Sequence, residues 1–443
     1  MNFNIPEYVN RILVSIQENG FEAYIVGGAA RDLIMGRVPK DWDIATNARP
    51  DSIKKIFDKT VDTGIKHGTV TVLIGNDHAE VTTYRTEAGY SDFRRPDSVE
   101  FVNDLKEDLQ RRDFTINALA YNLKEGLKDL NNGLIDIKEK IIRCVGNPEE
   151  RFCEDALRMM RAVRFACELG FAIETSTLSA IQKNAKLIKN ISSERIREEL
   201  NKILICTKPS EGIRLLDESG LLIFIMPELS KCQEVYQENP HHIYDVYNHI
   251  LKSVDIIKPE LHLRLTMLLH DLGKPYKKTN DKDGIGHFYG HDVVSAKMAE
   301  KILERLKYDN KISKRVITLV RWHDLRVNTE KLDVKKSAQK VGLEYFKDYF
   351  LVRAADINAQ NLDFAEEKLE KLKAAENLYY EIEKNNEPMS LNDLKINGND
   401  LINIGIKDGK KIGETLDFLM EKVLEKPEMN FREELIRIAK DNF

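Results

Sequence analysis

The sequence of 443 residues lacks the features of several specialised protein classes. Its five cysteines are Cys144, Cys153, Cys167, Cys206 and Cys232, and no two of them have Cys-x-x-Cys spacing. Scattered thiols in odd number predict reduced cysteines and therefore a cytoplasmic protein. No apolar run approaches the ~20 residues that a membrane-spanning helix needs. Residues 1–20 are typical of an amphipathic helix rather than of a signal peptide.

The chain also lacks an excess of positive charge. Its 68 lysines and arginines oppose 73 aspartates and glutamates, which gives a net charge of −5. Any nucleic-acid binding must therefore depend on local basic patches rather than on a field around the whole molecule. Internal repeats and low-complexity segments are absent, and the length suggests roughly three domains.

The most informative stretch is residues 24–46. Its apolar start, Tyr24–Val26, predicts a strand, and Gly27-Gly28 predicts a tight turn that leaves no side chain between backbone and ligand. A helix is expected over Ala29–Met35, and the free N–H groups at its start suit a phosphate. Arg31 falls in the first turn of this helix, where its guanidinium can reach such a phosphate. A lone Gly-Gly pair is more often only a turn.

Three carboxylates follow on two predicted strands. Asp41 and Asp43 are two residues apart where a strand over 43–45 begins, so their side chains point to the same face. Such a pair can bridge divalent cations, as two-metal phosphoryl transfer requires. Glu80 lies on a second strand that forms a hairpin around residues 75–77. It is either a third metal ligand or an exposed residue of the sheet.

A basic segment comes next. Arg111 and Arg112 can hold a triphosphate, and Arg112 is the stronger candidate of the two. Asp113 can accept a hydrogen bond from a ribose hydroxyl, which would favour ribonucleotides over deoxynucleotides. The alternative is a cluster of charges at the start of a helix.

A polar loop is expected over residues 85–98, which contain glycine and several aspartates. Its Tyr90, Phe93, Arg94 and Arg95 combine aromatic rings with cations, a mixture that suits RNA. The alternative is an ordinary solvated loop.

Residues 151–169 predict one long amphipathic helix, because apolar side chains recur at helical spacing. Asp155, Arg158, Arg161 and Arg164 are three residues apart, so each is turned by about 60° from the one before. Asp155 and Arg158 therefore share one edge of the helix. They form either a surface ion pair worth about 0.2–0.5 kcal/mol or a pair that selects a base.

The second interpretation rests on hydrogen-bond complementarity. A carboxylate accepts from an exocyclic amine while a guanidinium donates to the neighbouring ring acceptor, and both cytosine and adenine offer that combination. Uracil and guanine present a carbonyl oxygen to the carboxylate instead, so two acceptors would repel each other. An Asp155–Arg158 pair would thus select cytosine and adenine, with Arg161 and Arg164 as further nucleotide or phosphate contacts.

In this order, the segments resemble the polymerase-β-like nucleotidyltransferases. In detail they resemble the class II CCA-adding tRNA nucleotidyltransferases and the bacterial poly(A) polymerases, whose motif Glu-Asp-x-x-Arg-x-x-Arg matches residues 154–161. The resemblance implies an α+β fold in which a head with a mixed sheet precedes helical regions. It implies Mg²⁺ on Asp41 and Asp43, CTP and ATP as substrates and the tRNA 3′ end as partner. It implies no protein partner and no membrane.

A second centre is indicated by the histidines, because eight of the ten fall between His241 and His323. One histidine on an apolar helix is usually a core residue. His270-Asp271-Leu272-Gly273-Lys274 nevertheless resembles the HD phosphohydrolase superfamily, whose helical bundle holds one or two metals. That resemblance implies His249, His270, Asp271 and Asp356 as primary ligands.

His291 and His323 would serve a second metal or bind phosphate, and His287 is a less favoured candidate for a metal ligand. Histidine and carboxylate ligands suit divalent transition metals such as Ni²⁺ or Mn²⁺. Such a site would activate water on phosphate esters or 2′,3′-cyclic phosphates.

The expected domains are a head (1–143), a neck for base recognition (144–205), an RNA-binding body (206–238), an HD region (239–360) and a helical tail (361–443). A CC-adding enzyme and a poly(A) polymerase remain alternatives, although no strongly basic extension is present. A signalling nucleotide synthetase or protein uridylyltransferase would lack the Asp155–Arg158 helix. An HD phosphohydrolase with a degenerate head, or a noncatalytic RNA-binding protein, would not need Asp41 and Asp43.

Overall fold

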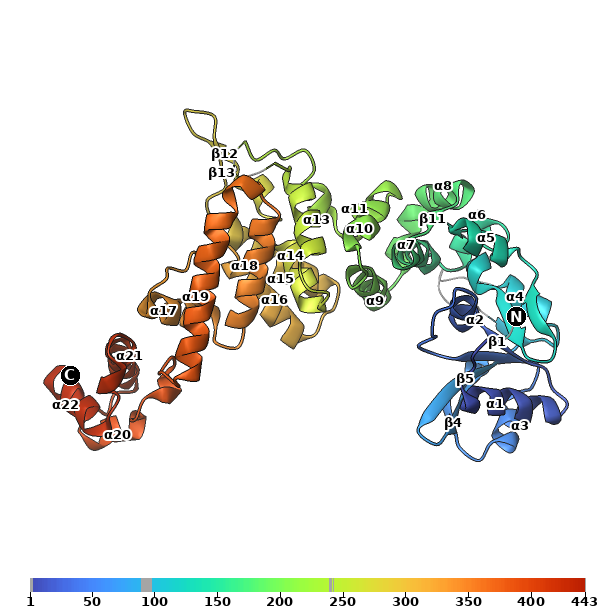
Figure 1. Ribbon diagram of the computed structural model, residues 1–443, viewed down its shortest axis with the longest axis horizontal. Coiled ribbons are helices and arrows are strands. Elements are labelled where there is room, and N and C mark those ends of the chain that lie inside the picture. Colours follow the sequence, from blue (N-terminus) through green and yellow to red (C-terminus); the bar gives the residue numbers. More distant parts are fainter. Residues whose placement is uncertain (1–2, 89–97, 239–240, 242, 443) are drawn as a thin grey trace. The chain divides into compact units, whose positions relative to one another are not determined.

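The computed structural model describes residues 3–88, 98–238, 241 and 243–442, and it contains two compact units, Met1–Pro227 and Glu228–Phe443 (Figure 1). Each unit has a hydrophobic core of its own. In the described part of the chain, none of the helices is both long and apolar enough to cross a membrane. The five smaller domains expected from the sequence stay a prediction.

The first unit begins with a seven-stranded mixed sheet in the order β3-β4-β5-β2-β1-β8-β9. The strands are β1 (Ala23–Val26), β2 (Asp43–Thr46), β3 (Thr60–Gly64), β4 (Thr69–Ile74), β5 (Asp77–Thr83), β8 (Leu119–Asn122) and β9 (Gly126–Asp129). β2 runs antiparallel to β1 and parallel to β5, which places Asp43 opposite Glu80. The expected mixed sheet and the hairpin of β4 and β5 are confirmed.

Helices cover this sheet because their apolar faces need burial. They are α1 (Glu7–Glu18), α2 (Gly27–Ile34), α3 (Pro50–Ile56), α4 (Leu105–Gln110) and α5 (Gly133–Glu139). Val9, Ile12 and Ile16 recur at helical spacing on α1 and are fully buried against the sheet. Helix α2 begins two residues before the expected Ala29. Gly27 adopts a φ of +67°, so the turn and the helix start coincide there.

The loop expected over residues 85–98 is wrong at both of its ends. Arg85–Ala88 forms strand β6, which pairs antiparallel with β7 (Ser98–Phe101). A hairpin is held by backbone hydrogen bonds, so polar side chains alone do not exclude it. The candidate RNA-contacting residues Tyr90, Phe93, Arg94 and Arg95 lie outside the described residues.

The single helix expected over 151–169 is also wrong, because the chain forms α6 (Pro148–Glu154) and then α7 (Leu157–Leu169). Asp155 lies between them in an extended conformation, with φ −136° and ψ 103°. Its carboxylate accepts a hydrogen bond from the backbone N–H of Leu157 at 3.1 Å. An aspartate side chain that bonds the backbone in this way competes with continued helix.

The first unit ends in helices that pack around α7. They are α8 (Thr175–Asn184), α9 (Ser193–Leu204), α10 (Pro209–Glu218) and α11 (Leu222–Ile225), with a two-stranded parallel sheet of β10 (Ile141–Ile142) and β11 (Ala172–Ile173). Both α9 and α10 contact α7 directly. The apolar side of α7, including Met159, Met160 and Val163, is completely buried.

The second unit is almost entirely helical (Figure 1). Its helices are α12 (Pro227–Ser230, at the boundary), α13 (Val246–Ile256), α14 (Leu261–Leu269), α15 (His291–Arg305), α16 (Asn310–Trp322), α17 (Lys331–Val341), α18 (Phe346–Asn358), α19 (Glu366–Lys384), α20 (Gly398–Asn403), α21 (Gly409–Glu425) and α22 (Arg432–Asn442). A short hairpin joins β12 (Thr279–Asn280) to β13 (Gly286–His287). Helix α14 is mostly apolar and is buried from Leu263 to Leu269, because α13, α15, α16 and α18 contact it. Its C-terminal end therefore places His270 and Asp271 inside the bundle.

Candidate active site and metal-ligand cluster

Three carboxylates meet where β2 and β5 run side by side. Asp43 lies opposite Glu80 in the strand register, and Asp41 and Glu80 both line a cavity of about 290 Å³. Burial raises the pKa of Asp43; Arg112 opposes this shift, while Glu80 and Asp41 add to it. A divalent cation would relieve the repulsion among these groups, and carboxylate oxygens are ligands that Mg²⁺ prefers. The residues present therefore fit a magnesium site.

The glycine turn lies directly against this cluster. A methyl group added at Gly27 would approach Arg112 Nη1 to 3.2 Å and Asp43 Oδ2 to 3.5 Å. The turn, Asp43 and Arg112 are thus neighbours. Asp108 orients Arg112 through an ion pair of 3.0 Å. Gly28 lies beside Arg31, whose Nη2 would be 3.8 Å from an added Cβ.

Arg31 is more enclosed than the sequence suggested. Only 5% of its surface is exposed, and its guanidinium donates to Asp32 and, at 2.9 Å, to Asn117. It also lies over the ring of Phe165, a residue of α7. Arg31 therefore connects α2 to the segment after α4, and its contact with a phosphate stays a prediction.

A partly buried ion pair joins the head to α7. Arg161 donates from Nε and Nη2 to Asp113 Oδ2 at 2.8 and 2.6 Å, and Asn117 donates to Asp113 Oδ1. Burial disfavours the charged carboxylate, but Arg161, Arg158 and Asn117 outweigh that effect and lower the pKa of Asp113 to about 2. Both oxygens of Asp113 already have protein donors. Its expected contact with a ribose hydroxyl remains a prediction.

Asp155 and Arg158 occupy the junction between α6 and α7 and have separate partners. Asp155 pairs with Arg195 of α9 at 2.9 Å, whereas Arg158 pairs with Glu154 at 2.5 Å. Arg158 Nη2 also donates to the backbone carbonyl of Arg111 at 3.1 Å. The guanidinium of Arg158 thus points toward the segment that carries Arg112.

Helix α9 braces α7 through two residues that were not predicted from the sequence. Arg195 holds Asp155, and Glu199 holds Arg164 through a buried ion pair of 2.7 Å. These two residues are four apart on α9, a spacing that places them on one face and was visible in the sequence. Arg164 also pairs with Glu168, and its contact with a nucleotide stays a prediction.

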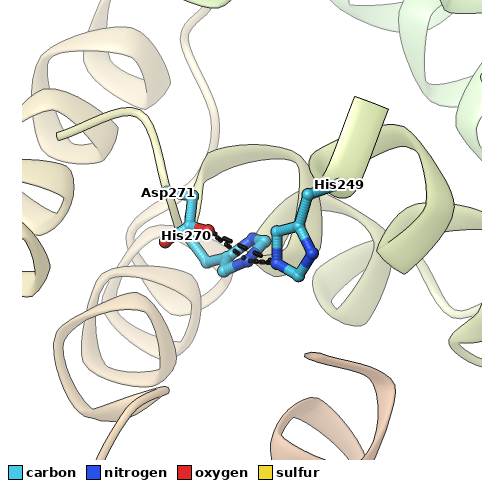
Figure 2. Close-up of side chains that lie close together, drawn as sticks. All are labelled: His249, His270 and Asp271. Carbon is cyan, nitrogen blue, oxygen red and sulfur yellow. Dashed lines mark hydrogen bonds and ion pairs between the residues drawn. The ribbon is translucent and has the colours of Figure 1, made fainter. Parts of the chain in front are cut away.

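The second unit gathers the predicted histidines and acids into two adjoining sets of three. One set is His249, His270 and Asp271, and the other is Asp271, His291 and His323. Figure 2 shows the first set converging from α13 and the end of α14. Asp356 on α18 lies 3.0 Å from His249 Nε2. Asp271 belongs to both sets, with Oδ2 facing His270 and Oδ1 facing His291.

The four imidazoles are oriented by the backbone. Each Nδ1 faces a carbonyl oxygen, at 3.2 Å for His249, 2.7 Å for His270 and 2.8 Å for both His291 and His323. Carbonyls only accept hydrogen bonds, so each Nδ1 donates its proton there, and Nε2 is the ring nitrogen that faces the other side chains of the cluster. The Nε2 atoms lie 3.3 Å apart for His249–His270 and 3.2 Å apart for His291–His323. Such an arrangement fits metal ions between the rings.

Asp271 is the shared acid of the cluster. Burial opposes its ionisation, but His270 and Lys274 outweigh that effect and hold its pKa well below the ordinary range. The carboxylate is therefore charged and ready to bridge two cations. His287 is outside both sets: it pairs with Asp281 at 3.0 Å on the β12–β13 hairpin.

The mixed sheet, the glycine turn and the carboxylate cluster beside Arg112 define a nucleotidyltransferase. Known family models match three segments of the chain: "Poly A polymerase head domain" at residues 23–143, "Probable RNA and SrmB- binding site of polymerase A" at 170–232 and a tRNA nucleotidyltransferase domain 2 at 291–439. A CCA-adding enzyme of Ligilactobacillus salivarius is 39% identical over 441 residues, which cover 99% of this chain and 97% of that protein. The chain belongs to the family of CCA-adding enzymes.

Other relatives agree with this assignment. A CCA-adding enzyme of Limosilactobacillus reuteri is 55% identical over 229 residues, which cover 52% of this chain and 57% of that one. The crystal structure of the Bacillus stearothermophilus CCA-adding enzyme in complex with CTP has a TM-score of 0.75 and 31% identity, covering 99% and 98% of the two chains. The Thermotoga maritima enzyme complexed with tRNA, at 22% identity and a TM-score of 0.60, shares the fold.

The oriented imidazoles lead to a prediction about metal binding. Protein without a histidine tag should bind about two Ni²⁺ ions in the second unit, because two sets of ligands share Asp271. Asp271→Asn should weaken binding of both ions at least about tenfold, whereas His291→Ala should remove only one. Isothermal titration calorimetry measures both. His287→Ala is the matched control and should bind as wild type; unchanged Ni²⁺ binding by Asp271→Asn would contradict the cluster.

Proposed function

We propose that this chain adds C, C and A to the 3′ end of tRNA, using CTP and ATP without a nucleic acid template. The observation that carries the proposal is the 39% identity to a CCA-adding enzyme along almost the whole of both chains. The neighbouring positions of Gly27, Arg112 and Asp43 support it. Relatives that were solved with CTP, ATP or tRNA support the same choice of substrates.

Asp41, Asp43 and Glu80 would hold Mg²⁺. When bound, the cation stabilises negative charge on the reacting phosphate and favours ionisation of the RNA 3′-OH. In the reaction the 3′ oxygen bonds to the α-phosphorus, the bond to the β-phosphate breaks, and pyrophosphate leaves. The open turn at Gly27-Gly28 and the guanidinium of Arg112 steady the triphosphate beside these carboxylates.

Base selection falls to Asp155 and Arg158. Asp155 accepts the exocyclic amine of cytosine or adenine, and Arg158 donates to the adjacent ring nitrogen. Arg195 and Glu154 hold the two side chains before the base arrives, so binding exchanges these ion pairs for base contacts. Arg161 keeps α7 attached to the head through Asp113. A carbonyl group of uracil or guanine would instead meet the carboxylate of Asp155.

The function is tested with tRNA that lacks its last three nucleotides, each nucleoside triphosphate being supplied separately and together. We expect two C additions with CTP alone and a complete CCA end with CTP and ATP. Asp43→Asn should reduce incorporation by at least about 10³-fold, since the remaining carboxylates would hold the cation poorly. Poly(A) products would indicate a poly(A) polymerase, and a stop after two C residues would indicate a CC-adding enzyme.

Base selection leads to a second prediction. Asp155→Ala should lower the CTP over UTP preference in kcat/KM by about 10- to 100-fold, because one base-specific acceptor is worth about 1–3 kcal/mol. Glu150→Ala, an exposed carboxylate on α6, is the control and should keep the preference. The role of Asp155 would be rejected if its variant discriminated as well as wild type.

A second candidate function, metal-dependent phosphohydrolase, is favoured by the four oriented imidazoles around Asp271. His249, His270, Asp271 and Asp356 would hold one metal, and His291 and His323 would hold another with Asp271. Such metals supply an activated water for attack on phosphate esters. Hydrolysis of bis(p-nitrophenyl) phosphate with added Ni²⁺ or Mn²⁺ tests this activity. Asp271→Asn should abolish it, and equal hydrolysis by that variant would reject it.

A further inference from the structure

A second cavity adjoins the metal-ligand cluster of the second unit. It measures about 550 Å³ and is lined by residues 324–328 after α16, by α18 and by α19, helices that neighbour one another in Figure 1. A smaller cavity of about 240 Å³ contains Asp271, His323 and Asp356. Asp324 and Gln360 line both cavities, so the two spaces share a wall.

The larger cavity is positively charged. Arg326, Arg353, Lys368 and Lys371 line it, and Asp324 is the carboxylate among the lining residues. Arg353 is already neutralised by ion pairs with Asp324 at 2.8 Å and with Asp356 at 2.7 Å, and Lys371 pairs with Glu367 at 2.5 Å. Among the residues that the structure describes, no carboxylate lies within ion-pair distance of Arg326 or Lys368. An excess of positive charge thus faces the cavity.

Lys368 connects the cavity to the cluster. Its Nζ donates to Gln360 Oε1 at 2.9 Å, and Gln360 Nε2 donates to Asp356 Oδ2 at 3.3 Å. Burial lowers the pKa of Lys368, and the positive charges of Arg353 and Arg326 lower it further, while the carboxylates of Asp356 and Asp324 oppose this shift. A bound anion would relieve this repulsion among like charges.

Apolar side chains form another part of the cavity wall. Leu325, Val327, Ile357 and Leu372 line it together with the ring of Tyr349. A pocket with an apolar wall and a few convergent cations is typical of sites for organic phosphates such as nucleotides. A free inorganic anion would leave the apolar wall without a partner.

We propose that this cavity binds a second phosphate of the substrate on Arg326 and Lys368, with the nucleoside along the apolar wall. The proposal rests on the phosphohydrolase function proposed above. It predicts that the preferred substrate is a nucleotide, or an RNA end, that carries two phosphates. Water oxygen bonds to the phosphorus at the cluster, the P–O bond to the nucleoside breaks, and the departing oxygen takes a proton. A nucleoside bisphosphate thereby yields a nucleoside monophosphate and inorganic phosphate.

The test compares adenosine 3′,5′-bisphosphate with 3′-AMP and 5′-AMP, using the full chain with Mn²⁺ and measuring phosphate release. We expect kcat/KM to be at least about tenfold higher for the bisphosphate, mainly through KM, since one charge-assisted contact is worth about that factor. Arg326→Met and Lys368→Met should each bring the ratio close to one. Lys373→Met is the matched control, because Lys373 lies on α19 and pairs with Glu376 outside the cavity.

Equal kcat/KM values for the bisphosphate and the monophosphates would overturn the proposal, as would a preference that both cavity variants retain. If no phosphate ester is hydrolysed, the phosphohydrolase function is rejected. Isothermal titration calorimetry with adenosine 3′,5′-bisphosphate then tests binding to the cavity without reference to hydrolysis. Binding that weakens about tenfold in Arg326→Met but not in Lys373→Met supports the site. No detectable binding to the wild-type chain rejects it.

Discussion

The first unit depends on the ion pair between Asp113, which is buried, and Arg161, which is partly exposed. It joins the segment that carries Arg112 to helix α7, so the proposed phosphate-binding and base-selecting residues are held in one arrangement. Burying a charge such as that of Asp113 is costly unless hydrogen bonds satisfy it. Here Arg161 donates twice, and Asn117 and the backbone N–H of Phe114 occupy the other oxygen. Asn117 also accepts from Arg31, which extends the same network to the helix after the glycine turn.

The second unit uses backbone carbonyls for a similar purpose. Four carbonyls fix four imidazoles with their Nε2 atoms directed inward, and the buried carboxylate of Asp271 serves both pairs. This orientation comes from the local ends of α14 and α16, where His270 and His323 each bond to the carbonyl three residues earlier. His270 and Asp271 are buried at the end of α14. The fold itself therefore sets the orientation of these rings.

The sequence predicted those features whose residues lie next to one another in the chain. The glycine turn, Asp41 and Asp43 with their strand, and the His270-Asp271 pair were all identified from adjacent residues. The break at Asp155 was missed because a side-chain hydrogen bond to Leu157 overrides the apolar periodicity of residues 151–169. Arg195, 40 residues from Asp155, was missed because its partner is set by the packing of α9 on α7. The β6–β7 hairpin was missed because its pairing lies in the backbone.

The central claim is that Asp155 and Arg158 act as the complement of the incoming base. A crystal structure of this protein with CTP and a nonreactive tRNA end tests it most directly. The account predicts Asp155 within hydrogen-bond distance of the cytosine N4 amine and Arg158 within that distance of N3, with the Asp155–Arg195 ion pair exchanged. A cytosine bound elsewhere, with the ion pairs of Asp155 and Arg158 unchanged, would contradict it.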